Sequence, residues 1–492
     1  MCVPKRYSLK IAVFILVIGS IIFLKLLFAN SGHHDQTCLP APLPLPLGVH
    51  KPDATHFSSF SEAVQHRANA NRSILMAYFD AGALNMTLNF YHSSLKPHGV
   101  THFLLVSSSS RACAAVQAEG LACFLYMSDA DSEKESVYMS KDFVRKMNIR
   151  TYMILEALKL GFNVLHTDVD VVYFTNPLTE VEKECPEKDC DLAPLWDSIV
   201  YNEGFVFIRS SPAGVRAFED MKVIAETTNK DDQVALNTVI KRGHKYGLRF
   251  KKLPVTQYLS GKAFYEDTER VFGNSAPGCH NCKVAHNNWI VSIEAKVYRF
   301  REMLQWIHDG LDGYYTNPDR RYLTYLNAEP SNTKGSETRD MEVKALRNAL
   351  AVSSLLNRTL ILPRFHTKTG VQCSLLNHLR LTEFDRAYRG EYRESTFLDH
   401  HLVPKHIKES ISKFVTIATD DAPDKSVYVP RDTKNGATSD EILAWFSGRN
   451  EAVLRFSTLY NAFSRFSDRR TQMRFQEKFD SVDLKGNYRQ YI

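Results

Sequence analysis

The chain has 492 residues, of which 44% are hydrophobic and 24% charged, and its formal net charge is +6 at pH 7. These proportions are ordinary for folded domains, so they exclude a chain dominated by disorder and leave room for a membrane anchor and two or three folded units. The positive charge is spread along the sequence. It fits anionic ligands such as nucleotide diphosphates, but it supports nucleic-acid binding only weakly, and we expect no nucleic-acid partner.

The first thirty residues predict a membrane anchor. An apolar stretch at residues 11–29 follows three basic residues, Lys5, Arg6 and Lys10. Its ~19 residues are enough for a helix to cross ~30 Å of hydrocarbon. Positive charge before the span predicts a cytoplasmic tail at residues 1–10 and a luminal remainder, as in a single-pass type II protein. The alternative is a signal peptide cleaved near Ala29-Asn30-Ser31, although the run exceeds the ~7–15 residues of a usual signal core.

Residues 30–70 are interpreted as a stem, because the stretch after Cys38 is rich in proline and favours extended polyproline.

Cysteine use agrees with an oxidising lumen, where local disulfides are expected. The close pairs are Cys113/Cys123, Cys185/Cys190 and Cys279/Cys282. The last pair lacks the second Cys/His pair that a zinc finger needs. Cys38 offers an intermolecular disulfide and hence a homodimer, but an unpaired or internally paired Cys38 fits equally well. Sequons at Asn71, Asn85 and Asn357 are consistent with luminal exposure.

From about residue 70 the pattern alternates between strands and helices. The expected order is a strand at 73–79, an amphipathic segment at 84–95, a strand at 102–106, a helix at 111–119, a strand at 122–127, a helix at 142–160 closed by Gly161, and a strand at 163–166. This alternation predicts an α/β domain with a mostly parallel sheet over residues 71–310. Ligands of such sheets bind beyond the carboxyl ends of the strands.

After residue 310 a second unit is expected. A helix at 341–356 and a strand at 359–363 predict an accessory α/β region over residues 335–430, and it resembles the helix–strand unit of other glycosyltransferase-like domains. We interpret it as influencing the acceptor, or as packing support without a ligand. Residues 431–492 are predicted to be a helical tail, with helical stretches around 440–462.

The central chemical signal is Asp168-Val-Asp170, which follows the apolar strand at 163–166 and precedes Asn176-Pro177. Residues two apart in an extended chain project to the same side. Two neighbouring carboxylates repel each other, and a shared cation removes that repulsion. Oxygen ligands suit Mg²⁺ or Mn²⁺, and either ion bridges carboxylates to a diphosphate. An isolated Asp-x-Asp is weak evidence, since a solvated acidic turn has the same sequence.

Several motifs in a fixed order resemble the nucleotide-diphospho-sugar transferases of glycosyltransferase family 77. The resemblance covers roughly residues 73–305, and the ordered set is more specific than any one motif. Ile290-Val-Ser292 lacks a glycine expected after the tryptophan. The matching segments are 151–177, Asn202-Glu-Gly-Phe205, Asp231-Asp-Gln-Val-Ala-Leu-Asn237, His286-Asn-Asn-Trp289, Lys296 and Arg299-Phe-Arg301.

The resemblance implies a GT-A fold, Golgi residence and a retaining sugar transfer. It implies that Asp170 is the main ligand of Mn²⁺ or Mg²⁺, that Asp168 contacts the metal or the donor ribose, and that His286 completes the metal site. Lys296 would neutralise the departing diphosphate. The alternative for His286 is a satisfied polar residue near Trp289, and for Lys296 a surface lysine.

The remaining candidate residues surround the reacting sugar. Asp232 and Gln233 are the catalytic candidates: Gln233 would stabilise the developing positive centre during same-face attack, and Asp232 would orient a sugar hydroxyl. A helix N-cap is the competing interpretation of Asp232. Asn202 and Gly204 would shape the acceptor side, and Asn202 is also a candidate donor ligand. Arg150 is a weaker diphosphate candidate beside a simple helix-surface charge. Trp196 and Trp289 are candidate sugar platforms or core residues.

The sequence therefore predicts a retaining, metal-dependent glycosyltransferase that uses a nucleotide-diphosphate sugar of the galactose, xylose or arabinose class and a glycan or glycoprotein acceptor. A luminal carbohydrate-binding or scaffold protein that has lost catalysis is the first alternative, and it does not explain intact metal ligands. A metal-dependent phosphohydrolase is the second, and it does not explain the stem or the later motifs.

Overall fold

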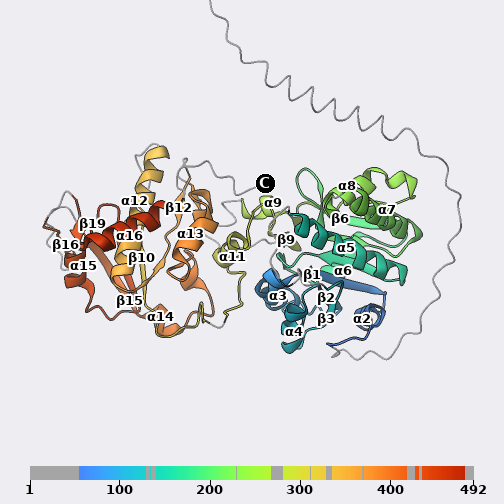
Figure 1. Ribbon diagram of the computed structural model, residues 1–492, viewed down its shortest axis with the longest axis horizontal. Coiled ribbons are helices and arrows are strands. Elements are labelled where there is room, and N and C mark those ends of the chain that lie inside the picture. The colour runs from blue at the N-terminus through green and yellow to red at the C-terminus, as the bar shows by residue number, and fades with distance from the viewer. Residues whose placement is uncertain are drawn as a thin grey trace, which may run out of the picture. The chain divides into compact units, whose positions relative to one another are not determined.

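The computed structural model describes residues 55–128, 133, 140–228, 230–266, 281–310, 312–327, 335–367, 371–417, 427–431 and 435–482 (Figure 1). All of these belong to one compact unit, residues 46–492. The predicted tail, the anchor at 11–29 and most of the stem lie outside the described residues. Within the described part of the chain, no helix has both the length and the hydropathy needed to cross a bilayer.

The first sheet has six strands in the order β3-β2-β1-β4-β7-β6. The pairs among β3, β2, β1 and β4 are parallel, and β7 runs antiparallel to both β4 and β6. The predicted mostly parallel α/β sheet is thus confirmed. Its strands are β1 (Ser73–Phe79), β2 (Phe103–Ser107), β3 (Cys123–Leu125), β4 (Asn163–Thr167), β6 (Leu192–Trp196) and β7 (Tyr201–Ile208).

Strand β1 shows why the sequence forms a central strand. All seven of its residues are buried. Leu75 and its odd-numbered neighbours pack with α3 and α4, whereas Met76 and its even-numbered neighbours pack with α5 and α7. A strand covered on both faces reads as a continuous apolar run. The covering helices are α3 (Leu84–Phe90), α4 (Ser110–Ala118), α5 (Lys141–Lys159), α6 (Pro177–Glu184), α7 (Pro212–Thr228) and α8 (Asp232–Lys241).

A small three-stranded sheet, in the order β5-β9-β8, lies at the carboxyl end of β4. It consists of β5 (Val171–Tyr173), β9 (Val284–His286) and β8 (Tyr258–Leu259), and the short helix α9 (Gly261–Tyr265) follows β8. The pairing of β5 with β9 is antiparallel and places Val171 opposite His286. The helix α11 (Ile293–Glu302) then closes this part of the chain.

The second large sheet also has six strands, and all of its pairs are parallel, in the order β14-β11-β10-β18-β15-β16. Its core strands are β10 (Tyr322–Tyr325), β11 (Thr359–Ile361) and β18 (Val453–Phe456), and the long helix α12 (Gly335–Leu355) joins β10 to β11. The other elements are β12 (Phe365–His366), β13 (Gln372–Cys373), α13 (Leu381–Tyr388), β14 (Tyr392–Arg393), α14 (Lys405–Glu409), β15 (Ile411–Ile417), β16 (Val427–Tyr428), β17 (Ala437–Thr438), α15 (Ser439–Phe446), β19 (Phe463–Arg465) and α16 (Arg469–Asp480).

Two sequence-based expectations are corrected. The helical stretch expected around 440–462 ends with α15, and β18 follows as an inner strand between β10 and β15. The sheet therefore contains one strand before residue 335 and one after residue 430 in sequence, so it extends beyond the predicted accessory region at 335–430. In addition, the last part of the predicted stem forms the helix α2 (Phe60–Arg67), and Arg67 Nε donates to the Phe103 carbonyl of β2 at 3.0 Å. That segment is part of the folded domain because its apolar face is buried against the sheet.

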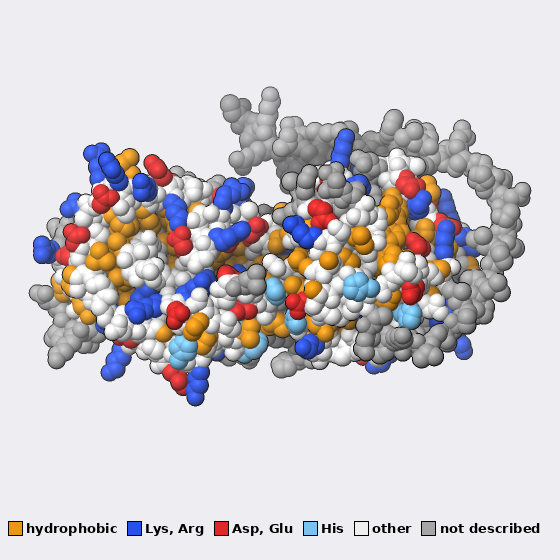
Figure 2. All heavy atoms as spheres, turned by 60° about the horizontal axis from the view of Figure 1, so that its bottom comes forward, with side chains coloured by type: hydrophobic (Ala, Val, Ile, Leu, Met, Phe, Trp, Pro, Cys, Tyr) orange, Lys and Arg blue, Asp and Glu red, His pale blue; other side chains and the backbone are white. Residues whose placement is uncertain are grey.

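Two of the predicted local disulfides are present, Cys113–Cys123 and Cys185–Cys190. Cys282 is also disulfide-bonded, whereas Cys279 lies outside the described residues. On the face shown in Figure 2, Lys and Arg side chains are interspersed with Asp and Glu. That distribution agrees with a net charge spread along the sequence.

Candidate metal and donor site

The site begins where β4 ends. Asp168 follows the strand directly, and its backbone N–H donates to the Gly204 carbonyl at 2.8 Å, which ties it to β7. Asp170 lies two residues later, just before β5. Gly204 is required here because a Cβ atom at that position would lie 2.3 Å from Asp168 Oδ2 and 2.6 Å from His286 Cε1.

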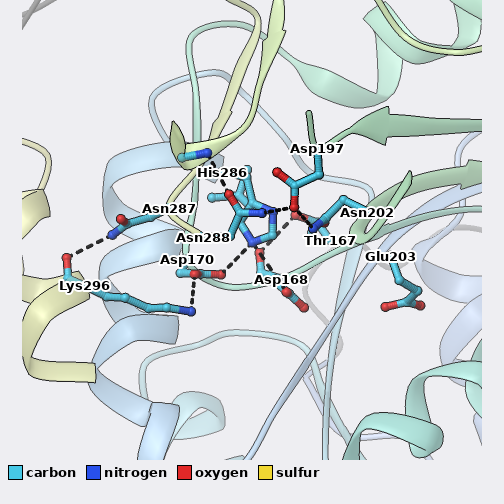
Figure 3. Close-up of polar contacts among 12 residues, drawn as sticks. Thr167, Asp168, Asp170, Asp197, Asn202, Glu203, His286, Asn287, Asn288 and Lys296 are labelled. Atoms are coloured by element: carbon cyan, nitrogen blue, oxygen red, sulfur yellow. Dashed lines mark hydrogen bonds and ion pairs between the residues drawn. The ribbon is translucent and has the colours of Figure 1, made fainter. Parts of the chain in front are cut away.

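The third predicted ligand arrives through the small sheet. His286 ends β9, and the N–H of the next residue, Asn287, donates to the Asp170 carbonyl at 2.8 Å. The imidazole therefore points at the two carboxylates although it lies far away in sequence (Figure 3). Its Nε2 atom lies 3.3 Å from Asp170 Oδ1 and 3.5 Å from Asp168 Oδ2.

These three side chains form the one cluster of potential metal ligands found in the described residues, with all ligand atoms within 4.8 Å of one another. Asp170 and His286 are buried, whereas the Asp168 side chain is 28% exposed. Lys296 of α11 completes the cluster, since its Nζ atom lies 2.7 Å from Asp170 Oδ2. Four residues that the sequence singled out are thus brought together.

The electrostatics of the cluster are those of a cation site. Burial raises the pKa of Asp170, but Lys296 and His286 outweigh it and hold the pKa below its ordinary value. Burial lowers the pKa of His286, yet Asp170 and Asp168 raise it to about 9. Both carboxylates are therefore ionised at neutral pH, and two cationic side chains balance them in the metal-free protein.

The residues fit a divalent metal. Two carboxylates and one imidazole are a ligand set that suits Mn²⁺. One of the three side chains is partly exposed, so one side of the site is accessible to a ligand. The partly exposed carboxylate of Asp168 supplies that side. A bound divalent ion would replace the imidazolium proton, because a coordinating histidine must be neutral.

Arg150 has a role that its sequence context did not show. It is buried, so the interpretation as a helix-surface charge is wrong. Its guanidinium contacts Asp168, lies 2.5 Å from Asp232 Oδ2 and 3.3 Å from Glu203 Oε2. Burial lowers the pKa of Arg150, but the three carboxylates raise it well above its ordinary value. We call Arg150, Glu203 and Asp232 the buried brace; it ties Asp168, a candidate metal ligand, to α8. A contact of Arg150 with the diphosphate stays a prediction.

The two catalytic candidates begin α8 and differ in accessibility. Asp231, not Asp232, caps the helix, since its side chain accepts the Val234 N–H. Asp232 is buried; Arg150 holds its Oδ2, and its Oδ1 accepts the Gln233 N–H at 2.9 Å. Gln233 is half-buried, and its Oε1 accepts the Glu203 N–H at 3.4 Å. Their catalytic roles stay predictions.

On the other side of the metal cluster, Asn202 lies on the same face of β7 as Gly204, because side chains two apart share a face. Its Nδ2 donates to Asp197 Oδ2 at 3.1 Å (Figure 3). Trp289 donates its indole N–H to the other oxygen of Asp197. Trp196 packs against Tyr201, with ring centroids 4.8 Å apart, so it is bound into the β6–β7 hairpin.

Sequence reasoning missed two buried acids of the site, Asp197 and Glu203. Asp197 directly follows the apolar strand β6, which is the same signal that Asp168 gives after β4. Glu203 is a charged residue within the otherwise apolar strand β7, a pattern that indicates a buried partner. Burial raises the pKa of Glu203 to about 7, with Arg150 lowering it and Asp168 raising it.

Comparison with known proteins gives consistent matches. The family described as nucleotide-diphospho-sugar transferase matches residues 98–300. Arabinosyltransferase XEG113 of Arabidopsis thaliana is 22% identical over 67% of this chain and 61% of its own length. Beta-arabinofuranosyltransferase RAY1 of the same plant is 26% identical over 49% of each chain. The chain thus spans about half to three fifths of the length of these curated relatives.

A solved structure of galactosyltransferase LgtC with donor and acceptor sugar analogues is 17% identical, with a TM-score of 0.31, over 47% of this chain and 94% of that one. The segment matched by the family, residues 98–300, contains both aspartates of the metal cluster, His286, the buried brace and Lys296. Over that segment the chain is similar to the nucleotide-diphospho-sugar transferase family.

Proposed function

We propose that the protein is a metal-dependent, retaining glycosyltransferase of the GT-A type, which moves a sugar from a nucleotide diphosphate to a glycan or glycoprotein. The observation that carries the proposal is the convergence of Asp168, Asp170 and His286 within 4.8 Å beside Lys296. Such a cluster suits a diphosphate, because a divalent ion bound there would take up its negative charge.

The donor class follows from the relatives. Curated relatives are named as arabinosyltransferases, as a UDP-galactose:fucoside alpha-3-galactosyltransferase and as UDP-D-xylose:L-fucose alpha-1,3-D-xylosyltransferases. We propose a UDP-linked sugar of the galactose, xylose or arabinose class on that basis. The predicted type II anchor and Golgi lumen belong to the same proposal, supported by the apolar run at residues 11–29.

Same-face attack is the mechanism that the chain's residues support best. A covalent intermediate needs an accessible carboxylate nucleophile. Asp232 is 1% exposed, and both of its oxygens are engaged by Arg150 and by a backbone N–H. Gln233 is more accessible, and its amide dipole can stabilise positive charge on the anomeric carbon. Lys296 would balance the charge of the departing diphosphate.

The test is nucleotide release by the purified full chain in mild detergent. UDP-galactose, UDP-xylose and UDP-arabinofuranose are supplied with Mn²⁺, with Mg²⁺ or with chelator, and Asp170→Asn is compared with the exposed control Asp312→Asn. We expect release from one donor that needs both the metal and Asp170. Metal-dependent release of phosphate from nucleotides that carry no sugar would instead support a phosphohydrolase, and absence of metal-dependent nucleotide binding would rule the proposal out.

A further inference from the structure

Asp197 is a buried acid at the edge of the candidate site with an unusual set of partners. It lies in the turn between β6 and β7 and is 4% exposed. Its carboxylate accepts three side-chain hydrogen bonds. Asn202 Nδ2 lies 3.1 Å and Asn288 Nδ2 2.6 Å from Oδ2, and the Trp289 indole N–H donates to Oδ1. Three donors around one buried carboxylate fix the positions of all three side chains.

A carboxylate oxygen accepts hydrogen bonds, so it decides which end of an amide faces it. The Asn202 amide must turn its Nδ2 toward Asp197, and its Oδ1 must face the other way. Asn202 is 5% exposed, and that Oδ1 atom is buried without a partner among the described residues. A buried acceptor without a partner requires an explanation, and a donor from a bound ligand is one. Asn202 shares its strand face with Gly204, which contacts the metal cluster.

The same carboxylate holds the loop that follows His286. Asn288 is fixed at three points: its Nδ2 by Asp197, its Oδ1 by the Gly261 N–H at 2.7 Å, and its carbonyl by Arg299 at 3.0 Å. The next residue, Trp289, has a φ of 60°, a left-handed conformation that a bulky residue adopts only when its surroundings impose it. Asp197 therefore connects the β6–β7 hairpin with the loop between β9 and α11.

We propose that Asp197 is a positioning residue for the donor sugar. It holds Asn202 with the Oδ1 atom free to accept a hydrogen bond from a sugar hydroxyl, and it holds Trp289 at the same rim of the site. This inference rests on the proposed transferase function and assigns the recognised group: a hydroxyl of the sugar, not the nucleotide. Asp197 acts through Asn202 and touches no reacting atom.

The test separates sugar binding from nucleotide binding. Asp197→Asn keeps the shape but replaces one acceptor oxygen by an N–H₂ group, so at least one of the three donors loses its acceptor. In the full chain with saturating Mn²⁺, we expect the Kd of UDP to change less than about 2-fold, while that of UDP-galactose rises about 10-fold, the loss of one buried hydrogen bond. UDP-xylose or UDP-arabinofuranose takes its place if the wild type binds that sugar instead.

A double variant of Asp197 and Asn202 is a control for a general loss of structure, because only a shared hydrogen bond makes the two effects on binding non-additive. Asn202→Ala should weaken sugar-nucleotide binding to a similar extent, and the double variant should be no weaker than either single variant, since both act on the same hydrogen bond. A conservative Asp197→Glu restores the acceptor charge and should recover part of the affinity if its longer stem still reaches Asn202.

A spectroscopic readout tests the contact without any ligand. The chain has 4 tryptophans, and only Trp289 donates to Asp197. Asp197→Asn should shift the tryptophan emission of the wild type but leave that of a Trp289→Phe background unchanged. Equal weakening of UDP and UDP-sugar, or an unchanged emission spectrum, would overturn the inference. If the wild type binds no nucleotide at all, the proposed function fails, and the emission measurement alone decides the Asp197 contact.

Discussion

Gly204 and Asp168 touch so closely that no side chain is tolerated between them: a Cβ atom on Gly204 would lie 2.3 Å from Asp168 Oδ2. The backbone of β7 is therefore one wall of the metal cluster. Gly204→Ala must push Asp168 or His286 out of position, and a misplaced ligand typically costs a metal site 10–100-fold in affinity. We expect Mn²⁺ binding, measured by calorimetry on the full chain, to weaken by about that factor.

The matched control is Gly243→Ala in the same domain. A Cβ atom there would have its nearest neighbour at 3.7 Å, an ordinary van der Waals distance. Its Mn²⁺ affinity and melting temperature should equal those of the wild type. Unchanged Mn²⁺ affinity in Gly204→Ala would mean that the cluster does not bind the metal in the arrangement described.

Lys296 is expected to have opposite effects on metal binding and on turnover. In the metal-free protein its Nζ atom lies 2.7 Å from Asp170 Oδ2 and thus competes with a cation for that oxygen. Lys296→Met should bind Mn²⁺ several-fold more tightly. Turnover should fall about 100-fold, because a positive charge beside the departing diphosphate is lost. Calorimetry and nucleotide release measure the two quantities separately.

The opposite sign of the two changes makes the Lys296 experiment informative. A variant with poor folding would lose both metal affinity and turnover, so a simultaneous decrease would contradict the assigned role. Lys262 is a suitable comparison, since its Nζ lies over the Trp289 ring at 5.4 Å and contacts no ligand of the metal cluster. Lys262→Met should leave Mn²⁺ affinity unchanged.

Local sequence was sufficient for the four parallel strands of the first sheet, but not for β6 and β7, and it singled out two of the three candidate metal ligands, Asp168 and Asp170. The strand predicted at 73–79 matches β1 residue for residue, since its burial on both faces gives an uninterrupted apolar run. The helix predicted at 142–160 is α5 to within one residue, because Gly161 adopts a φ of 86° and ends it. Asp168 and Asp170 were found because strand ends and acidic pairs are both local signals.

Long-range partners could not be predicted in the same way. The buried brace joins α5, β7 and α8, and nothing near Arg150 in the sequence shows that three acids surround it. β18 was expected to be helical because an inner parallel strand and a buried helix segment have similar apolar content. Asp197 has partners up to 92 positions away, so only the fold shows its role.

The buried brace should make Arg150 essential for stability. Removing one partner of a buried ion pair usually costs about 3–5 kcal/mol, because the remaining charge stays buried without compensation. We expect Arg150→Met to lower the free energy of unfolding by that order. The loss should be smaller at pH 5 than at pH 8, since the orphaned acids Glu203 and Asp232 can then take up protons. Thermal melting at both pH values measures it.

An exposed ion pair supplies the control for Arg150. Lys405 and Glu409 lie 3.4 Å apart with side chains 86% and 64% exposed. Lys405→Ala should cost less than about 1 kcal/mol at either pH. If Arg150→Met melted like this control, the guanidinium would not be the group that holds Asp168 and α8 together.

Glu302 should make the stability of the protein depend on pH. It ends α11, is 4% exposed and accepts a hydrogen bond from Tyr298 at 3.3 Å. Burial raises its pKa from 4.5 to about 7, and the hydrogen bonds of Ser374 and Tyr298 only partly offset it. Because the folded-state pKa is raised, the contribution of this carboxyl to stability is present below about pH 4.5 and lost as the pH rises through 7.

Glu302→Gln removes the titration and keeps the shape of the side chain. The difference between 4.5 and about 7 corresponds to about 3 kcal/mol, so the variant should be more stable than the wild type by up to that amount at pH 8. At pH 5 the gain should shrink to about 1 kcal/mol or less, since the wild-type carboxyl is then protonated in the folded state. Unfolding in urea at a series of pH values measures both. The exposed Glu409→Gln should show no such pH dependence, and an equal gain at pH 5 and pH 8 in Glu302→Gln would mean that burial does not hold a proton on this carboxyl.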